Sequence, residues 1–149
     1  MIFTRTSEYA LRAVTVLAMQ PAGKRTGARE ISEAEGIPMP FLWKILQNLA
    51  RRRVVRSFKG IRGGYELARP SDRITLHEVV FATDGMDFSN QCVLGLPHCG
   101  QENSCPLHDI WKRIRADMTA MLERNTLADL ARVARKRAVK KKRGSATRN

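Results

Sequence analysis

Three cysteines and a histidine lie within one short stretch of the chain, and their residue types suit metal binding. The stretch reads Cys92-Val-Leu-Gly-Leu-Pro-His-Cys99-Gly-Gln-Glu-Asn-Ser-Cys105-Pro-Leu-His108, which is a C-x6-C-x5-C-x2-H spacing. Thiolates are soft ligands that favour iron–sulfur clusters or zinc. These are all the cysteines of the chain, and an odd number confined to one segment is not a disulfide framework. We therefore interpret the stretch as a candidate metal or redox site.

The spacing favours a cluster but leaves zinc open. Zinc sites usually contain C-x2–4-C pairs, and this segment has none. Gaps of five and six residues enclose a larger group more readily. Cys105 and His108 are three residues apart at the predicted start of a helix, where side chains share a face and the helix N-terminus lowers the pKa of a thiol. The alternative without metal chemistry is three free thiols beside an ordinary surface histidine.

The charge of the chain indicates a polyanionic partner. Its 149 residues include 27 Lys and Arg against 14 Asp and Glu, which gives a formal net charge of +13. Such a balance points to nucleic acid first and to anionic membranes second. No apolar run approaches the roughly 18–20 residues that span a bilayer, and Glu8 and Arg12 interrupt any signal-peptide pattern. We expect a cytoplasmic protein that does not enter a membrane.

Positive charge gathers in two places. Residues 132–149 contain nine Lys and Arg, no acidic residue and almost no apolar periodicity. We expect a basic, disordered tail there, which either increases solubility or binds DNA. Residues 24–69 contain eleven Lys and Arg against four acidic residues. This second concentration coincides with a segment patterned for folding, so it is the more specific indication of a binding surface.

The elements around residues 24–69 form a DNA-binding pattern. Apolar periodicity predicts helices over residues 6–20, 27–35 and 39–52. The second and third helices, separated by a short turn at Gly36, make a helix-turn-helix. Extended runs over residues 54–58 and 65–68 flank a glycine-rich turn and predict a β-hairpin. A hairpin that directly follows a helix-turn-helix is a wing.

The second half of the chain is predicted to be helical on either side of an irregular loop. Thr75-x-x-Glu78 is a capping box for a helix over residues 76–83. The loop that holds the cysteines is followed by a helix over residues 106–124, capped by Ser104, and by a short helix from about residue 126. The long helix carries an apolar stripe of Leu107, Ile110, Trp111, Ile114, Met118, Met121 and Leu122. The predicted fold is mostly α with a small β-wing: a winged helix-turn-helix plus a long helix.

The third helix is the candidate recognition helix, which must bury one face and offer the other to DNA. Its apolar stripe is Leu42, Ile45, Leu46 and Leu49. The outward set is Met39, Pro40, Trp43, Lys44, Gln47, Asn48 and Arg51. Gln and Asn can pair with adenine, and Lys and Arg with guanine, while Pro40 and Trp43 either touch thymine methyl groups or pack on the scaffold. At the wing tip, Lys59 and Arg62 have the chemistry for a minor groove; the alternative is a solvated basic turn.

Together these features resemble the Rrf-two (Rrf2) family of bacterial winged-helix transcription regulators, of the IscR, NsrR and RirA kind. The resemblance is carried by Ser7-Glu-Tyr-Ala-Leu-Arg, Phe41-Leu-Trp-Lys-Ile-Leu-Gln-Asn-Leu, Gly60-Ile-Arg-Gly-Gly-Tyr-Glu-Leu-Ala, the three-cysteine stretch and Thr126-Leu-Ala-Asp-Leu. It covers nearly the whole chain up to about residue 131. The first cysteine gap is six residues, where well-known members commonly have five, and the basic tail extends beyond the family pattern.

The resemblance implies a homodimer held by the long helix and bound to a roughly palindromic operator in double-stranded DNA. It also implies an iron–sulfur cluster that senses nitric oxide, iron or redox state, with Cys92, Cys99 and Cys105 matching the three cysteine ligands. In members with a 2Fe-2S cluster of the IscR kind, the fourth ligand is a histidine at the position of His108. In members with a 4Fe-4S cluster of the NsrR kind, it is a carboxylate from the partner's first helix, where Glu8 lies. This chain offers both.

The same resemblance divides the chain by function. Residues 1–84 are the implied DNA-binding domain and residues 85–105 the implied cluster-binding loop. Residues 106–131 are the implied dimerisation helix and short C-terminal helix, and residues 132–149 are the tail.

Two other functions are compatible with the residues. One is a winged-helix regulator with a zinc or thiol switch and no cluster. The other is a nonspecific nucleic-acid-binding architectural protein whose basic tail supplies most of the affinity. We do not expect an enzyme, because Cys105 and His108 lack an orienting third group and no phosphate-binding glycine loop or paired carboxylates accompany them.

Overall fold

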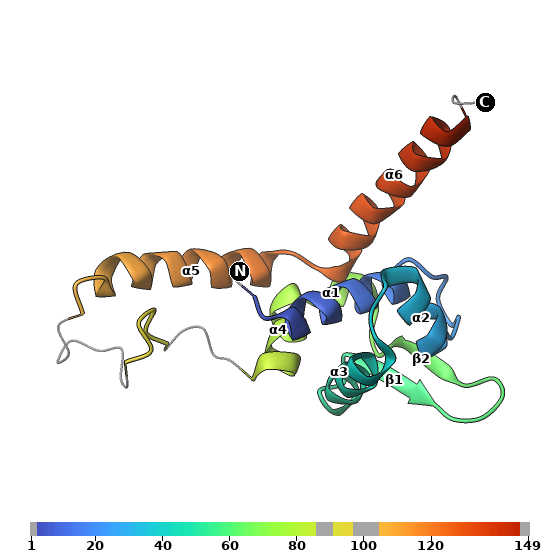
Figure 1. Ribbon diagram of the computed structural model, residues 1–149, viewed down its shortest axis with the longest axis horizontal. Coiled ribbons are helices and arrows are strands. Elements are labelled where there is room, and N and C mark those ends of the chain that lie inside the picture. Colours follow the sequence, from blue (N-terminus) through green and yellow to red (C-terminus); the bar gives the residue numbers. More distant parts are fainter. Residues whose placement is uncertain (1–2, 86–90, 97–104, 147–149) are drawn as a thin grey trace.

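The computed structural model describes residues 3–85, 91–96 and 105–146, and this part of the chain forms a helical body with a small hairpin (Figure 1). Its elements are α1 (Arg5–Ala18), α2 (Ala28–Glu35), α3 (Met39–Arg51), β1 (Val55–Phe58), β2 (Gly64–Leu67), the 3-10 helix η1 (Ser71–Arg73), α4 (Leu76–Asp84), α5 (His108–Arg124) and α6 (Leu127–Ala146). The predicted fold, mostly α with a small β-wing, is confirmed. None of the helices in the described ranges is long and apolar enough to cross a membrane.

Local capping explains where several helices begin and end. At the start of α1 the Thr4 hydroxyl accepts a hydrogen bond from the Ser7 N–H, at 3.2 Å. Gly36 ends α2 in the left-handed region, with φ of 63°, a conformation that glycine adopts at little cost. The capping box predicted for α4 is confirmed: the Glu78 N–H donates to the Thr75 hydroxyl at 3.2 Å, and the Thr75 N–H donates to the Glu78 carboxylate at 2.9 Å.

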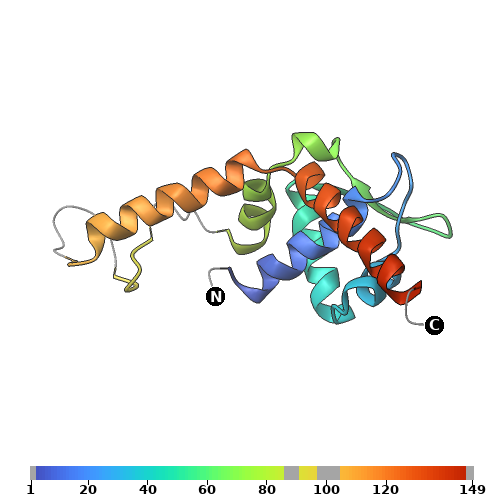
Figure 2. The same ribbon diagram turned by 90° about the horizontal axis from the view of Figure 1, so that it is seen from above.

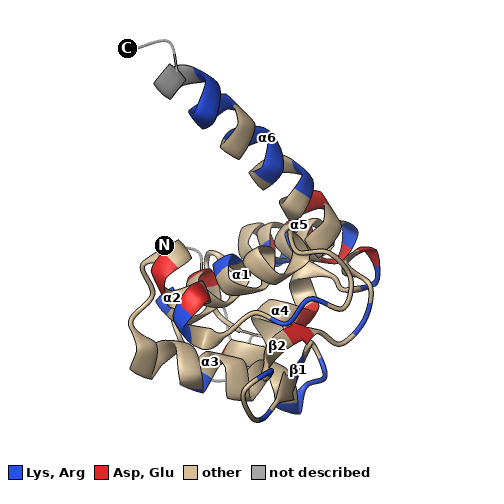
Figure 3. Cartoon of the chain, turned by 90° about the vertical axis from the view of Figure 1, so that its right-hand side faces the viewer, with Lys and Arg blue, Asp and Glu red and all other residues tan. Residues whose placement is uncertain are grey.

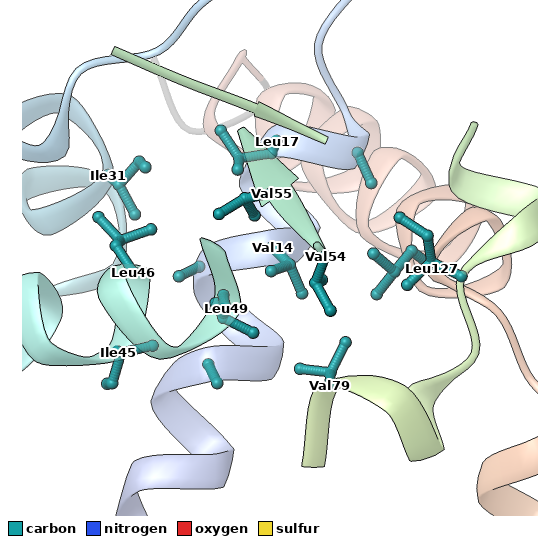
Figure 4. Packing of buried hydrophobic residues seen from close by; sticks show 14 of the residues in the cluster. Val14, Leu17, Ile31, Ile45, Leu46, Leu49, Val54, Val55, Val79 and Leu127 are labelled. Carbon is teal, nitrogen blue, oxygen red and sulfur yellow. The ribbon is translucent and has the colours of Figure 1, made fainter. Parts of the chain in front are cut away.

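The hydrophobic core lies around α1. This helix contacts α2, α3, α4 and α6, and Figure 4 shows Val14 and Leu17 of α1 among Leu46, Leu49 and Leu127. Each of these five side chains is at most 5% exposed. Because Leu127 belongs to α6, the C-terminal helix is packed into the same core as the helix-turn-helix.

The wing is a two-stranded antiparallel hairpin that a third segment supports. β1 and β2 pair with Val55 opposite Leu67 and Phe58 opposite Gly64. Thr26, in the segment before α2, exchanges both backbone hydrogen bonds with Tyr65, at 2.9 and 2.8 Å. A Cβ atom at Gly64 would lie 2.8 Å from the Thr26 carbonyl oxygen, so this close approach requires glycine. The chain between α1 and α2 therefore supports β2 close to the turn of the hairpin.

α5 differs from its prediction in where it begins and in what it buries. It begins at His108 rather than at residue 106, and Leu107 at its N-cap position makes no side-chain cap hydrogen bond. The predicted cap, Ser104, lies outside the described residues. Of the predicted apolar stripe, Leu122 is buried, Trp111 and Met118 are half-buried, and the others are exposed: Leu107, Ile110, Ile114 and Met121. In a single chain, most of this stripe has no apolar cover from the described residues.

α6 is a long helix, and the prediction of a short helix followed by a disordered tail is wrong. The helix continues through residues 132–146, because Ala, Arg, Lys and Leu are strong helix formers and no proline or glycine occurs between Leu127 and Gly144. Its first turn is capped by Asp129, whose carboxylate accepts the Thr126 N–H at 2.8 Å. The expectation that this part of the chain is basic and exposed is met (Figure 3).

Candidate functional site

α3 separates its apolar and polar faces as the sequence pattern predicts. Its buried stripe is Leu42, Ile45, Leu46 and Leu49, each at most 2% exposed. On the other face Pro40, Lys44, Gln47 and Arg51 are exposed and Asn48 is half-buried. Trp43 is 55% exposed, so its indole does not pack on the scaffold. α3 therefore presents amide, cationic and aromatic side chains on one outer surface, the groups that can contact base edges and phosphates.

Two residues of α3 differ from the predicted outward set. Met39 was expected to face outward, but it is half-buried and packs against the hydrophobic core. Phe41 was not in the set, but it is 59% exposed. The exposure of Phe41 could have been predicted from helical spacing, because Phe41 lies three residues before Lys44 and therefore on the same face of α3. The outward surface of α3 is thus more aromatic than the predicted set.

The wing tip lies beyond the body of the domain and is open to solvent (Figure 1). Lys59, Ile61 and Arg62 are all exposed. The tip is held by Arg25, whose guanidinium carbon lies 3.6 Å from the centroid of the Phe58 ring. Arg25 Nη1 also donates a hydrogen bond to the Arg62 carbonyl oxygen at 3.2 Å. Sequence reasoning missed this role, because Arg25 and Arg62 are far apart in the chain.

Positive charge continues from α3 into the wing. Arg51, Arg52, Arg53 and Arg56 are exposed between the end of α3 and β1, and Figure 3 shows Lys and Arg colour along the β1–β2 hairpin. Arg52 also lies over the Phe81 ring, 5.1 Å from its centroid. A strip of cations beside a protruding helix and hairpin suits the phosphates of a duplex.

The described cysteines lie at the two ends of the predicted cluster loop. Cys92 and Cys105 are half-buried, and neither forms a disulfide. The Cys92 carbonyl accepts the Gly95 N–H at 3.0 Å, and the Cys105 carbonyl accepts the His108 N–H at 3.0 Å. Cys105 and His108 therefore belong to the turn that leads into α5. The third predicted ligand, Cys99, lies outside the described residues.

The residue before Cys92 is attached firmly to α5. The Gln91 carbonyl oxygen accepts hydrogen bonds from Trp111 Nε1 and from Arg115 Nη1, both at 2.7 Å. Arg115 is 6% exposed, and its Nε makes no hydrogen bond to any residue that the structure describes. Figure 2 shows this segment beside the part of α5 farthest from the helix-turn-helix and its hairpin. The position of Cys92 is thus tied to α5, not to the winged helix-turn-helix.

Glu8 occupies a different part of the molecule, at the beginning of α1. It is half-buried in the first turn of that helix. The same turn is bound to the end of α4, because the Asp84 carboxylate accepts hydrogen bonds from the Thr4 hydroxyl (2.7 Å) and the Ser7 hydroxyl (2.5 Å). Asp84 is the last residue of α4, so this contact fixes the end of α4, from which the chain continues toward the cysteines.

The side chains around the cysteines suit an anionic thiolate-bound group. Cys92 and Cys105 provide soft donors, His108 provides an imidazole, and the buried guanidinium of Arg115 lies on the Gln91 carbonyl. Within the described part of the chain, no three His, Cys, Asp or Glu side chains already gather as a metal site. Thiolates and an imidazole are donors whose chemistry suits an iron–sulfur cluster, and the predicted ligand Cys99 lies outside the described residues.

The titration of Glu78, in the first turn of α4, has a clear structural cause. Partial burial alone would raise the pKa of Glu78, but the hydrogen bond from the Thr75 N–H and the ion pair with Arg69 outweigh it. Arg69 Nη2 lies 2.6 Å from the Glu78 carboxylate. The pKa of Glu78 is therefore lower than its ordinary value, and the carboxylate stays ionised at the start of α4.

Comparisons with known proteins agree on one family. The family model named Rrf2, described as an iron-dependent transcriptional regulator, matches residues 3–133. A Mycobacterium tuberculosis protein designated an HTH-type transcriptional regulator is 42% identical over 127 residues, which are 84% of this chain and 78% of the relative. The transcriptional regulator IscR of Sodalis glossinidius is 30% identical over 130 residues, 87% of this chain and 78% of that one. Among solved structures, CymR of B. subtilis, a global cysteine regulator, matches in fold with a TM-score of 0.76 and 24% identity, covering 88% of this chain and 96% of that chain.

Proposed function

The chain belongs to the Rrf2 family of transcriptional regulators, and from this premise we propose that it is a homodimeric, sequence-specific DNA-binding protein whose affinity for DNA depends on an iron–sulfur cluster. The observation that carries the proposal is the attachment of the Cys92 segment to α5 through the Gln91 carbonyl. This contact connects a group bound by the cysteines directly to α5, a 17-residue helix.

α3 is the proposed recognition helix and the β1–β2 hairpin the proposed wing. In the major groove, Gln47 and Asn48 have the donor and acceptor pair that adenine requires, and Lys44 can contact guanine. The exposed indole of Trp43, with Pro40, can contact thymine methyl groups. Lys59 and Arg62 extend toward a minor groove or the phosphates that border it. Arg51 contributes a phosphate contact, which affects affinity more than sequence choice.

A second copy of the chain is the proposed cover for the apolar face of α5. Ile110, Ile114 and Met121 are exposed at helical spacing, and exposed apolar stripes of this kind mark protein–protein contacts. A two-fold dimer along α5 presents two recognition helices to the same DNA. The two half-sites of a roughly palindromic operator then lie about 34–36 Å apart, which is one turn of the DNA double helix.

Cys92, Cys99 and Cys105 are the proposed cysteine ligands, with His108 as the preferred fourth ligand and Glu8 of a second copy as the other candidate. His108 is favoured because its N–H is bonded to the Cys105 carbonyl, so both residues belong to one turn. When bound, a cluster supplies a redox- and nitric oxide-reactive centre to this segment. A group bound by Cys92 and Cys105 would add a further crosslink between the two ends of this segment.

α5 can transmit this change to the DNA-binding domain because its two ends are attached to different partners. Near its beginning, Trp111 and Arg115 hold Gln91. At its other end, the Asn125 carbonyl accepts the Leu76 N–H at 3.0 Å, and the Ile74 carbonyl accepts the Leu127 N–H at 3.0 Å. A shift of the cysteine segment therefore moves a rigid helix whose far end is bonded to the start of α4.

Anaerobic purification tests the cluster, with a visible absorption spectrum and with iron and acid-labile sulfide counted on the same sample. We expect a brown protein in which sulfide accompanies iron, and we expect replacement of Cys99 with Ala to remove both. A colourless protein, still without sulfide after attempted cluster reconstitution, contradicts the cluster assignment and leaves a winged-helix regulator with a zinc or thiol switch.

A further inference from the structure

The last described turns of α6 carry a dense group of cations, which we call the basic segment, residues 136–143. Six of its eight residues are Lys or Arg, and every one of them is exposed. They are Lys136, Arg137, Lys140, Lys141, Lys142 and Arg143. The intervening Ala138 and Val139 do not form an apolar face, which distinguishes the segment from a helix that lies on a lipid surface.

The contacts described between α6 and the rest of the fold involve the part of the helix up to Arg135. Leu127 and Ala131 are buried in the core, Arg132 pairs with Asp129 at 3.0 Å, and Arg135 Nη2 donates to the Ala18 carbonyl at 3.1 Å. From residue 136 to residue 143, all described side chains are exposed. Core packing therefore explains the first half of the helix but gives no reason for the charge of the second half.

The charges of the basic segment repel one another along the helix. Lys136 and Lys140, and likewise Arg137 and Lys141, are four residues apart, a spacing at which like charges destabilise a helix. No acidic residue follows Asp129 in the sequence. A polyanion removes this repulsion, so the helix is more stable when the segment is bound to one.

The position of the basic segment determines which polyanion it can meet. In Figures 1 and 3, α6 projects from the body on the side away from α3 and the β1–β2 hairpin. Within one chain, a duplex held by the recognition helix and wing thus lies on the opposite side from the basic segment. An eight-residue helical segment is about 12 Å long and narrow enough to enter a major groove, where phosphates of both strands border it.

We propose that the basic segment binds a second stretch of duplex DNA, so that the protein bridges two DNA segments. This goes beyond the regulator function proposed above, which requires a single operator. Duplex DNA is favoured because the opposite face of the protein is itself a DNA-binding face, which brings a high local concentration of further duplex within reach.

A bead assay with two duplexes tests the bridge. One duplex is fixed to beads, a second fluorescent duplex is in solution, and full-length protein is added. The test variant combines Lys140→Gln, Lys141→Gln, Lys142→Gln and Arg143→Gln. Its matched control combines Lys140→Arg, Lys141→Arg and Lys142→Arg, which keeps the charge. Helix content by circular dichroism and binding to a single duplex by fluorescence anisotropy are measured for each protein.

The wild type and the arginine variant are expected to capture the second duplex, and the glutamine variant to capture at least tenfold less while still binding one duplex. Capture should also depend less on salt in the glutamine variant. The slope of log affinity against log salt concentration should decrease in magnitude by about 0.9 for each phosphate that the segment no longer neutralises. Bridging through the two recognition helices of a dimer alone would leave the glutamine variant unchanged and would overturn the inference.

Two further outcomes separate the bridge from the proposed regulator function. If the wild type binds a single duplex but captures no second one, the bridge is wrong and the regulator function is unaffected. If it captures an RNA hairpin in place of the second DNA duplex, the assignment to DNA is wrong. Failure to bind even one duplex contradicts both the bridge and the regulator function.

Discussion

Arg115 of α5 donates a 2.7 Å hydrogen bond to the carbonyl oxygen of Gln91, the residue that directly precedes Cys92. The guanidinium is almost wholly buried, and Trp111 donates to the same oxygen. A buried cation that holds the backbone next to a proposed thiolate ligand fixes the position of that ligand.

Replacing Arg115 with Met should make the cluster easier to lose. Removal of a charge-assisted hydrogen bond costs about 1.5 kcal/mol, which is about a tenfold change in an equilibrium. The measurement is the rate at which the visible absorbance of the anaerobic protein bleaches in the presence of an iron chelator. Arg113→Met is the matched control, because Arg113 is exposed on the same helix. Equal bleaching rates for the two variants would show that Arg115 has no role at the cluster.

Two substitutions in α3 should separate sequence reading from general affinity. Gln47→Ala should relax the preference at one base pair of the selected operator, at a cost of about 1–3 kcal/mol against the best site. Arg51→Ala should instead weaken binding to all sequences and reduce the salt slope by about 1. Both are measured by titrating a panel of single-base operator variants at several salt concentrations. An unchanged base preference in Gln47→Ala argues against α3 as the reading element.

Arg25→Ala should weaken DNA binding although Arg25 is outside the recognition helix. Its guanidinium stacks on Phe58 and donates a hydrogen bond to the Arg62 carbonyl oxygen. Its removal should therefore lower the free energy that holds the wing tip in place by about 0.5–1 kcal/mol. Faster amide hydrogen exchange in residues 58–64 should accompany a several-fold decrease in affinity. Arg29→Ala, on the exposed surface of α2, is the control for charge alone. Weaker binding with unchanged exchange would mean that Arg25 contacts DNA directly.

The pH dependence of stability should include a contribution from Glu78. Its pKa is lowered in the folded state, so its stabilisation is fully present above the ordinary value of 4.5 and is lost as the pH falls through the folded value. Glu78→Ala should lower the free energy of unfolding by about 1 kcal/mol at neutral pH, since it also removes half of a capping box. The difference from wild type should shrink below about pH 4 in denaturant titrations. Glu33→Ala, on the exposed surface of α2, is the control.

The sequence was most informative where one local rule decides the structure. The buried stripe of α3, from Leu42 to Leu49, follows from helical periodicity, and the start of α4 follows from the capping box at Thr75. In both cases neighbouring residues provide the determining contacts. The exposed Trp43 also follows from periodicity, although its alternative, packing on the scaffold, could be excluded only by the packed structure.

Contacts between distant residues could not be predicted in this way. Thr26 pairs with Tyr65, and Gln91 is bonded to Trp111 and Arg115, without any shared pattern in the sequence. Met39 has the position of an outward residue but reaches the core because its side chain is long, unbranched and apolar. The helix through residues 132–146 is not indicated by apolar periodicity, because it follows from the helix propensity of Ala, Lys and Arg.

We propose that a cluster bound at Cys92, Cys99 and Cys105 controls the affinity of α3 and the wing for DNA. The most direct test selects a preferred duplex from a random pool with the anaerobic protein, and then measures affinity for that duplex in three forms. These are the cluster-loaded protein, the same protein after cluster removal, and the Cys99→Ala variant. We predict that removal and substitution change the affinity equally, while salt-dependent binding to unrelated DNA stays the same. Equal affinity of all three forms for the selected duplex would contradict the claim.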